Sequence, residues 1–189
     1  MPGLHFFLTR FAPKCLRSVA FDTKYRRGDW DFAKEGPDPV GDFVRRFANH
    51  GDVLLMGCGS AFVLRDLNPR EFTSVLGIDL SAEAIRRARR YAAPNVAFQQ
   101  GDMATFRCPK TYDAILFSES FYYVPPLRRR PLLQRLCDSL KSRGCILITI
   151  AQPDRYRKTL SMIRRHFAIL EDKQLESSDR RLLAIRAKA

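Results

Sequence analysis

A short loop with two glycines, Gly57-Cys58-Gly59, directly follows the apolar run 53–56. Glycine lets the main chain come close to a ligand, and open α/β folds bind ligands at the carboxyl ends of their strands. A dinucleotide-binding fingerprint requires a third glycine at position 62, where this chain has Phe62, and the chain has no phosphate-binding G-K-[ST] sequence. The loop is compatible with a ligand site or with a tight strand-to-helix turn, but it fits neither a dinucleotide nor a nucleoside triphosphate.

Two carboxylates stand at the ends of the next two predicted strands. Asp79 lies 20 residues after Gly59, where a carboxylate can accept two hydrogen bonds from ribose hydroxyls. Asp102 lies in the sequence Gly101-Asp102-Met103, which ends the following run. Because these features follow successive strands, the sequence predicts one binding site at the carboxyl end of a sheet.

Alternating strand and helix patterns must position these residues. Short apolar runs predict strands at 53–56, 74–80, 95–102, 112–118 and 145–151. One-sided apolar patterns predict helices at 40–49, 81–93, 127–141 and 153–166. Ser81 is expected to cap the second helix, Pro131 to lie in the first turn of the third, and Gly144 to follow its end. This alternation predicts a mostly parallel sheet with helices on both faces.

The last part of the chain has a different pattern. Residues 166–177 and 179–189 are predicted to be two strands joined by the turn-like sequence 177–179. Strands with so short a connection pair in antiparallel fashion. The sequence therefore predicts an α/β fold whose parallel sheet is extended by an antiparallel C-terminal hairpin.

Four motifs, in this order and spacing, resemble those of the class I S-adenosylmethionine-dependent methyltransferases. They are VLLMGCGSA (53–61), LGIDLSAEAIRRAR (76–89), FQQGDM (98–103) and YDAILFSESFYYV (112–124). The resemblance covers residues 40–189 and implies a three-layer, Rossmann-like, mostly parallel seven-stranded sheet with an antiparallel tail. More weakly, SESFYY (118–123) and the segment 21–32 are similar to the nodulation protein S type of small-molecule methyltransferase.

The resemblance implies S-adenosyl-L-methionine as the cofactor. The glycine loop would admit the methionine moiety, Asp79 would bind the ribose, and Asp102 with Met103 would frame the adenine. The complete set of expected cofactor contacts in these motifs is Gly57, Cys58, Gly59, Asp79, Leu80, Asp102, Met103 and Ser118.

The resemblance also places the methyl acceptor after the fourth strand, where Glu119, Tyr122 and Tyr123 are the candidate catalytic residues. Methyl transfer is an in-line displacement, so the protein must mainly align the nucleophile and exclude water. A general base is needed only when the nucleophile carries a proton that must leave.

Three aromatic side chains, Tyr25, Trp30 and Phe121, are candidates to present ring faces to the sulfonium. The alternative for each ring is packing in the core. Tyr25 and Trp30 are predicted to contact the cofactor.

Two positions depart from the family pattern. The family usually has an acidic residue two places before the first glycine, and this chain has Leu55; the last position of the first motif, often glycine, is Ala61. Both departures leave room for weak cofactor binding or for a domain that has lost catalysis.

Composition limits the remaining possibilities. With 189 residues, 46% of them hydrophobic, the chain fits a single domain, predicted as an N-terminal helical cap (1–50) and a cofactor-binding core (51–189). Five scattered cysteines without a CxxC pair argue against a disulfide framework and against a zinc site. The apolar runs are too short to span a membrane, so we expect a cytoplasmic protein without a metal or a membrane partner.

The N-terminal residues 1–21 have the composition of an organelle transit peptide, but an amphipathic helix packed on the domain explains them better. The segment 1–50 is the only spare chain long enough to cover the carboxyl end of the sheet. It is expected to close the acceptor pocket.

The net charge of +13 leaves the acceptor open. The leading hypothesis is methyl transfer to an N or O atom of a small molecule. The alternatives are an RNA methyltransferase that uses the basic surface, and a catalytically silent methyltransferase-like binding protein.

Overall fold

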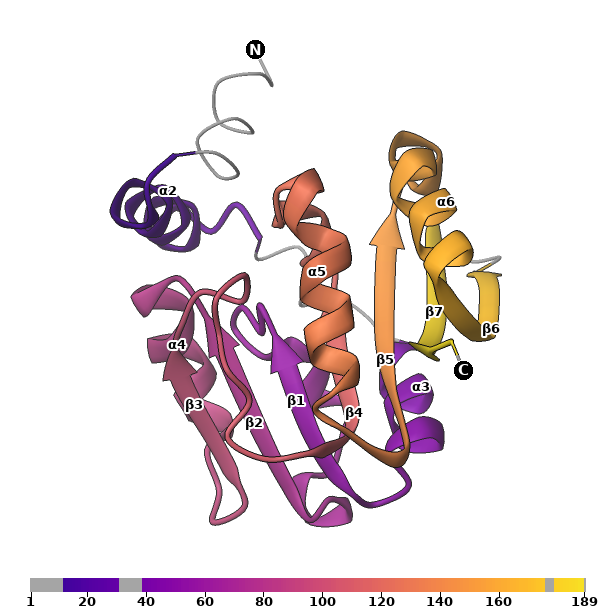
Figure 1. Cartoon of the computed structure of the whole chain (residues 1–189). Coiled ribbons are helices and arrows are strands. Elements are labelled where there is room, and N and C mark those ends of the chain that lie inside the picture. The colour runs from indigo at the N-terminus through magenta and orange to yellow at the C-terminus, as the bar shows by residue number, and fades with distance from the viewer. Residues whose placement is uncertain (1–11, 31–38, 176–178, 189) are drawn as a thin grey trace.

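Seven strands form one sheet in the order β3-β2-β1-β4-β5-β7-β6 in this computed structural model, which describes residues 12–30, 39–175 and 179–188 (Figure 1). The strands are Asp52–Met56 (β1), Ser74–Asp79 (β2), Val96–Gln100 (β3), Tyr112–Ser118 (β4), Leu140–Ala151 (β5), Phe167–Leu175 (β6) and Arg180–Ala187 (β7). β1 to β5 pair in parallel, whereas β7 pairs antiparallel with both β5 and β6. The predicted fold class and the C-terminal hairpin are confirmed, and most of the predicted turn 177–179 lies outside the described residues.

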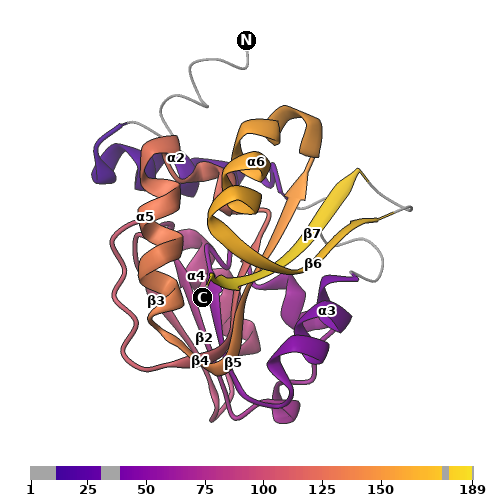
Figure 2. The same cartoon turned by 45° about the vertical axis from the view of Figure 1, so that its right-hand side comes forward.

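Helices cover both faces of the sheet, because the central strands present apolar side chains to each face. Val53 and Leu55 of β1 join the core beneath α3 (Val40–Ala48) and α4 (Ala82–Ala88). Leu54 and Met56 join the opposite core, beneath α5 (Pro126–Cys137) and α6 (Arg157–His166). Figure 2 shows α3 and α5 on opposite sides of the sheet. This burial on both faces explains the continuous apolar run of β1.

The predicted helix 127–141 is wrong at its C-terminal end. α5 ends at Cys137 and β5 begins at Leu140, which pairs with Tyr112 of β4. Leu140 continued the helical spacing of the leucines before it, so the local pattern concealed the change. Gly144 does not terminate the helix but lies within β5, where a Cβ atom would stand 2.7 Å from the carbonyl oxygen of Tyr112. Pro131 lies inside α5 and not in its first turn.

Two other predicted helices form with small differences. Ser81 caps α4 as expected, accepting a hydrogen bond from the Ala84 N–H at 3.0 Å. A 3₁₀ turn, Arg89–Tyr91, then replaces the end of the predicted helix 81–93. A 3₁₀ turn, Pro153–Tyr156, likewise precedes α6.

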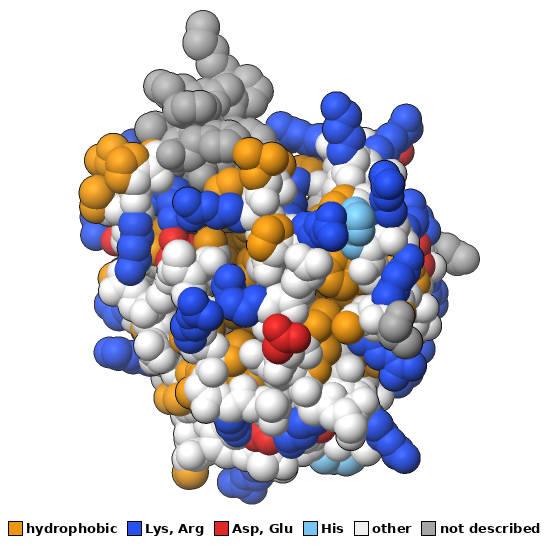
Figure 3. Space-filling model, in the orientation of Figure 1, with side chains coloured by type: hydrophobic (Ala, Val, Ile, Leu, Met, Phe, Trp, Pro, Cys, Tyr) orange, Lys and Arg blue, Asp and Glu red, His pale blue; other side chains and the backbone are white. Residues whose placement is uncertain are grey.

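The basic residues are distributed over the surface. Figure 3 shows Lys and Arg side chains spread over the face that carries α5 and α6, with few acidic side chains among them. Within the described ranges, no helix combines the length and apolar character needed to cross a membrane.

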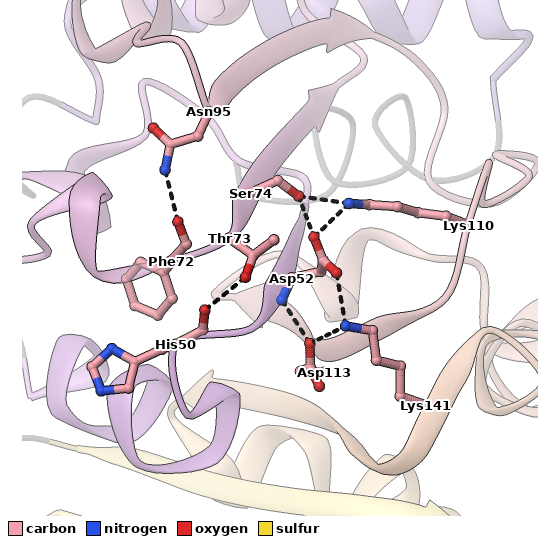
Figure 4. A network of polar contacts seen from close by, with 9 residues as sticks. All are labelled: His50, Asp52, Phe72, Thr73, Ser74, Asn95, Lys110, Asp113 and Lys141. Carbon is pink, nitrogen blue, oxygen red and sulfur yellow. Dashed lines mark hydrogen bonds and ion pairs between the residues drawn. The ribbon is translucent and has the colours of Figure 1, made fainter.

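At the amino ends of the strands, a network of charges ties the sheet together (Figure 4). Asp52 Oδ1 accepts hydrogen bonds from Lys110 Nζ and from the Ser74 hydroxyl, the latter at 2.6 Å. Asp52 Oδ2 accepts one from Lys141 Nζ at 2.8 Å. Lys141 also donates to Asp113 Oδ2, which accepts the Asp52 N–H as well. Burial by itself raises the pKa of Asp52, but these hydrogen bonds outweigh it and hold the pKa well below its usual range.

Candidate active site

A cavity of about 470 Å³ lies at the carboxyl ends of the parallel strands, a size typical of small-molecule sites. It spans the place where the strand order reverses between β1 and β4, which is where open α/β sheets bind ligands. All the residues predicted for the site line this cavity: Tyr25, Trp30, Gly57, Cys58, Gly59, Asp79, Leu80, Asp102, Met103, Ser118, Glu119, Tyr122 and Tyr123. The structure thus brings them together, while their individual roles stay predictions.

The loop after β1 needs its glycines. Gly57 and Gly59 have φ angles of 70° and 56°, in the left-handed region that favours glycine. A Cβ atom on Gly57 would lie 2.7 Å from Cβ of Ser120, and one on Gly59 would lie 2.7 Å from the Tyr25 hydroxyl oxygen. The loop is therefore held close to its neighbours and presents main chain to the cavity.

Asp79 organises this loop as well as facing the cavity. Its Oδ2 accepts the Gly59 N–H and its Oδ1 accepts the Ser81 N–H, both at 2.9 Å. Burial raises the pKa of Asp79 to about 6, although these backbone hydrogen bonds oppose the rise. Each carboxylate oxygen has a further lone pair, so ribose hydroxyls can donate to Asp79 without displacing the loop.

The structure shows the surroundings of Leu55 and Ala61, the two residues that depart from the family pattern. Leu55 is buried in the core beneath the cavity, and the loop is instead ordered by Asp79 and by a 2.8 Å hydrogen bond from the Cys58 N–H to the Ile78 carbonyl. Ala61 has a φ of 56°, so an L-residue occupies a conformation that glycine adopts more easily. The loop is therefore ordered without the acidic residue that the family usually has.

The helix α2 (Lys14–Arg27) lies across the carboxyl ends of β2 and β3, beyond the arrowheads of the parallel strands in Figure 1. Its Ser18 hydroxyl donates to the Leu80 carbonyl at 3.1 Å. Asp22 Oδ1 accepts the Ser81 hydroxyl at 2.5 Å and the Glu83 N–H at 3.1 Å. These residues belong to the segment predicted to cover the site, and the parts of that segment in residues 1–11 and 31–38 lie outside the described residues.

Both carboxylate oxygens of Asp102 have a partner. Its Oδ1 accepts the Ala104 N–H at 3.0 Å, and its Oδ2 forms an ion pair with Arg17 of α2. Met103 lies beside the glycine loop, since a Cβ atom on Gly57 would stand 3.2 Å from its Cε. Sequence reasoning missed Arg17, which belongs to no motif and stands 85 residues from its partner.

Aromatic rings form one wall of the cavity. Tyr25 and Trp30 meet edge to face with centroids 4.6 Å apart, and Trp30 also lies near Phe21 and Tyr123, at 5.9 and 6.4 Å. Burial raises the pKa of Tyr25 well above its usual range, and the nearby Asp79 adds to this. Phe121, the third candidate ring, follows the alternative of core packing, since it is fully buried against Phe117.

Glu119 directly follows β4 and has an unusual backbone conformation. Its φ is 51°, a strained value for a residue other than glycine, and such strain concentrates at functional sites. Its Oε2 accepts the Ala151 N–H at 2.6 Å, and its own N–H donates to the Thr149 hydroxyl at 3.0 Å. The carboxylate is therefore oriented by β5, the neighbouring strand.

Tyr122 and Tyr123 follow in a 3₁₀ turn (Phe121–Tyr123) that the buried Arg129 supports. The Arg129 guanidinium donates to the carbonyls of Tyr122 and Val124, each at 2.9 Å. Burial, followed by the proximity of Glu119, raises the pKa of Tyr122 well above its usual range. The Tyr122 hydroxyl therefore keeps its proton at neutral pH.

The family model for a methyltransferase domain matches residues 53–144, from the first residues of β1 into β5. That range contains the glycine loop, both carboxylates of the cofactor side and Glu119. Residues 53–144 thus form a methyltransferase domain, and the chain has the fold of solved S-adenosylmethionine-dependent methyltransferases. The predicted family and its cofactor, S-adenosyl-L-methionine, are thereby confirmed.

Relatives of this methyltransferase are named for different activities. The carboxy-S-adenosyl-L-methionine synthase of Wolinella succinogenes is 32% identical over 130 residues, covering 62% of this chain and 52% of that protein. The chain spans about half the length of the curated relatives it matches. These relatives therefore do not transfer an acceptor to this protein.

Solved structures share the fold of this methyltransferase. A 1,6-didemethyltoxoflavin-N1-methyltransferase from Burkholderia thailandensis superposes with a TM-score of 0.74 at 15% identity, covering 91% of this chain and 87% of that one. The N-methyltransferase NodS from Bradyrhizobium japonicum, bound to S-adenosyl-L-homocysteine, has a TM-score of 0.68 at 15% identity, covering 89% and 99%. The predicted similarity to the nodulation protein S type is confirmed at the level of the fold.

Proposed function

We propose that this protein transfers a methyl group from S-adenosylmethionine to a nitrogen or oxygen atom of a small-molecule acceptor. The observation that carries the proposal is the division of the cavity. The predicted cofactor contacts on β1, β2 and β3 form one half, and Ser118, Glu119 and Ala151 at the ends of β4 and β5 line the other. Both halves open into one space under α2 and the aromatic wall.

The cofactor half fits S-adenosylmethionine in its donors and acceptors. A main chain that excludes Cβ atoms at Gly57 and Gly59 leaves room for the methionine moiety. Asp79 offers lone pairs to ribose hydroxyls, and Asp102 offers a carboxylate to the adenine. When bound, S-adenosylmethionine supplies an activated methyl group on its sulfonium sulfur.

In the acceptor half, Glu119 is the candidate general base. The Ala151 N–H holds its carboxylate at 2.6 Å, which fixes its direction without occupying all its lone pairs. An amine or hydroxyl acceptor must lose a proton when it is methylated, and Glu119 can take that proton. Tyr122 and Tyr123 position the flat side of an acceptor, while α2 and Trp30 exclude water.

Small acceptors are supported by the enclosed cavity and by the similar N1-methyltransferase structure, whose bound acceptor is 1,6-didemethyltoxoflavin. The experiment is a screen of amine, heterocyclic and phenolic acceptors with S-adenosylmethionine labelled in the methyl group. Binding of S-adenosylhomocysteine is measured separately by calorimetry. Cofactor binding without transfer to any acceptor in the panel would favour a silent binding domain.

The variant Glu119→Gln tests the acceptor half of the cavity separately from the cofactor half. It should lower the rate of transfer about 100-fold with any acceptor that must lose a proton, because the base is removed. S-adenosylhomocysteine should bind as it does to the wild type. An unchanged rate would remove Glu119 from the mechanism.

An RNA acceptor is the second candidate, and one surface cluster favours it. Arg130 of α5, Arg165 and His166 of α6, and Lys188 after β7 come from distant parts of the chain and converge, with Lys188 Nζ donating to the Arg165 carbonyl at 2.7 Å. Slight burial and these three cations hold the pKa of His166 below its usual range. Arginine supplies 25 of the 33 basic residues, and guanidinium groups suit phosphate recognition.

The RNA candidate is tested with a fluorescent single-stranded RNA over a range of salt concentrations. Replacing Arg130, Arg165 and Lys188 by Gln together should weaken binding and reduce its salt dependence by about three phosphate contacts. The matched control replaces three exposed residues of α2, Lys14, Arg26 and Arg27. Equal losses in both triple and control variants would indicate binding by net charge alone.

A further inference from the structure

The ion pair between Arg17 and Asp102 joins the covering helix to the cofactor half of the cavity. Both side chains are largely shielded from solvent, with 11% of Arg17 and 6% of Asp102 exposed. Arg17 Nη2 donates to Asp102 Oδ2, while Asp102 Oδ1 accepts the Ala104 N–H. The carboxylate that the family motif assigns to the adenine therefore already has a partner on each oxygen.

The helix that carries Arg17 is held by polar contacts and by the aromatic rings of Phe21 and Tyr25. Ser18 and Asp22 bond to the backbone and hydroxyl groups at the end of β2 and the start of α4. Phe21 is the one buried side chain of α2, whereas Leu16 and Val19 are exposed. The polar contacts of this helix can be exchanged for contacts with a ligand that offers matching donors.

We propose that Arg17 is an internal competitor for the adenine-binding carboxylate and sets the affinity for the cofactor. Asp102 can accept an amino group of adenine only by giving up, or sharing, the guanidinium of Arg17. Cofactor binding is then coupled to the docking of α2 through a single carboxylate. This inference rests on the proposed function, in particular on Asp102 as the residue that faces the adenine.

A purely structural ion pair would behave differently. If the pair only attached α2 to the core, removing Arg17 would lower stability and leave cofactor affinity unchanged or weaker. If Arg17 competes, its removal leaves Asp102 buried without a cationic partner in the free protein, and the ligand then satisfies it. Affinity should then increase.

The experiment measures S-adenosylhomocysteine binding by calorimetry for the wild type and for Arg17→Gln. Competition predicts an affinity about tenfold higher in the variant. It also predicts that salt strengthens binding to the wild type, because salt weakens the ion pair, and that the variant lacks this dependence. Adenosine, which lacks the methionine moiety, should show the same difference.

Two controls accompany the measurement. Arg17→Lys keeps a cation beside Asp102 and should bind close to the wild type, and Arg26→Gln removes an exposed charge of the same helix without contact to Asp102. Thermal denaturation establishes that each variant is folded. An Arg17→Gln affinity equal to or below that of the wild type overturns the proposal.

Asp102→Asn distinguishes failure of this inference from failure of its premise. If Asp102 faces the adenine, Asp102→Asn weakens S-adenosylhomocysteine binding and abolishes the effect of a second substitution at Arg17. If Asp102→Asn binds S-adenosylhomocysteine as tightly as the wild type, Asp102 does not face the adenine, and the proposed competition is wrong as well. If the wild type itself binds neither S-adenosylhomocysteine nor S-adenosylmethionine, the proposed function fails first.

Discussion

The two ends of the parallel sheet are built from the same residue types with opposite results. At the amino end, Asp52 and Asp113 meet Lys110 and Lys141 in a network in which each carboxylate is bonded to lysine. At the carboxyl end, Asp79 and Asp102 bond mainly to backbone N–H groups and to one arginine of a covering helix. Paired charges occupy the amino end of the sheet, whereas the carboxyl end leaves a cavity.

Left-handed backbone conformations occur at both ends of the sheet, and at the amino end Asn49 and His50 before β1 have φ angles of 42° and 64°. Each central strand leaves the sheet at its carboxyl end through a left-handed residue: Gly57 after β1, Glu119 after β4 and Gln152 after β5, with φ of 70°, 51° and 51°. Two of these are not glycine, so the turns store strain near the site. At the carboxyl end these turns lie beside the cavity, since Gly57, Glu119 and Ala151 line it.

The largest effect is expected from Gly59→Val. A β-branched side chain at a φ of 56° would be strained and would meet the Tyr25 hydroxyl, filling the space next to the loop. Binding of S-adenosylhomocysteine should be lost in calorimetry while the sheet stays folded. The control is Gly41→Ala in α3, where the nearest atom to a new Cβ is 3.6 Å away. Wild-type affinity in Gly59→Val would mean that the loop does not contact the cofactor.

Asp79→Ala should weaken S-adenosylhomocysteine binding by about 1–3 kcal/mol, since hydrogen bonds to a charged acceptor are lost. The fold should remain, because the carboxylate lies at a strand end, although the Gly59 and Ser81 N–H groups lose their acceptor. Calorimetry and circular dichroism check the two parts. A folded variant with unchanged affinity would contradict the ribose assignment.

The pH dependence of binding sharpens the same point. Burial raises the pKa of Asp79 to about 6, and ribose hydroxyls donate best to the ionised carboxylate. Affinity for S-adenosylhomocysteine should therefore be full above that pH and decrease below it. Titrations on either side of that value should show this decrease in the wild type and not in Asp79→Ala.

Asp52→Asn tests the amino end. Replacing a carboxylate bonded by two lysines should lower the free energy of unfolding by about 1–3 kcal/mol, with no change in cofactor affinity. The folded pKa of Asp52 is depressed, so its stabilisation is present above the ordinary carboxyl pKa and is lost as pH falls through the folded one. Urea denaturation at neutral and acidic pH measures both parts. Asp42→Asn, at an exposed ion pair, is the control and should change stability by less than about 0.5 kcal/mol.

The smallest effect is expected from Ala61→Gly. Glycine relieves an unfavourable φ of 56°, a gain of about 1–2 kcal/mol. The change also removes a fully buried methyl group, a loss of about 0.8 kcal/mol, and adds conformational entropy to the unfolded chain. Urea denaturation should show little net change in the free energy of unfolding. A loss above about 1.5 kcal/mol would mean that packing of the methyl group stabilises the protein by more than the unfavourable φ angle destabilises it.

Local patterns were sufficient for most of the fold and for the residues of the cofactor half. The apolar run 53–56, the glycine pair and the carboxylates at positions 79 and 102 are each recognisable within a few residues. Parallel strands bring their carboxyl ends to one edge, so finding the strands also located the site. The same local reasoning wrongly extended the predicted helix 127–141 into β5, because Leu140 fits a helical period as well as it fits a strand.

The sequence by itself therefore determined the order of strands and helices, the glycine loop and the carboxylates that follow the strands, since periodicity and turn chemistry act between near neighbours. Only the tertiary structure decided which charges meet. Arg17 pairs with Asp102 across 85 positions, and Lys141 with Asp52 across 89. The chain has 33 basic and 20 acidic residues, and their spacing along it does not select these pairs. The selection follows from packing, because the apolar faces of the sheet and helices bring particular strand ends and one face of α2 together, and buried carboxylates then require the partners that lie within reach.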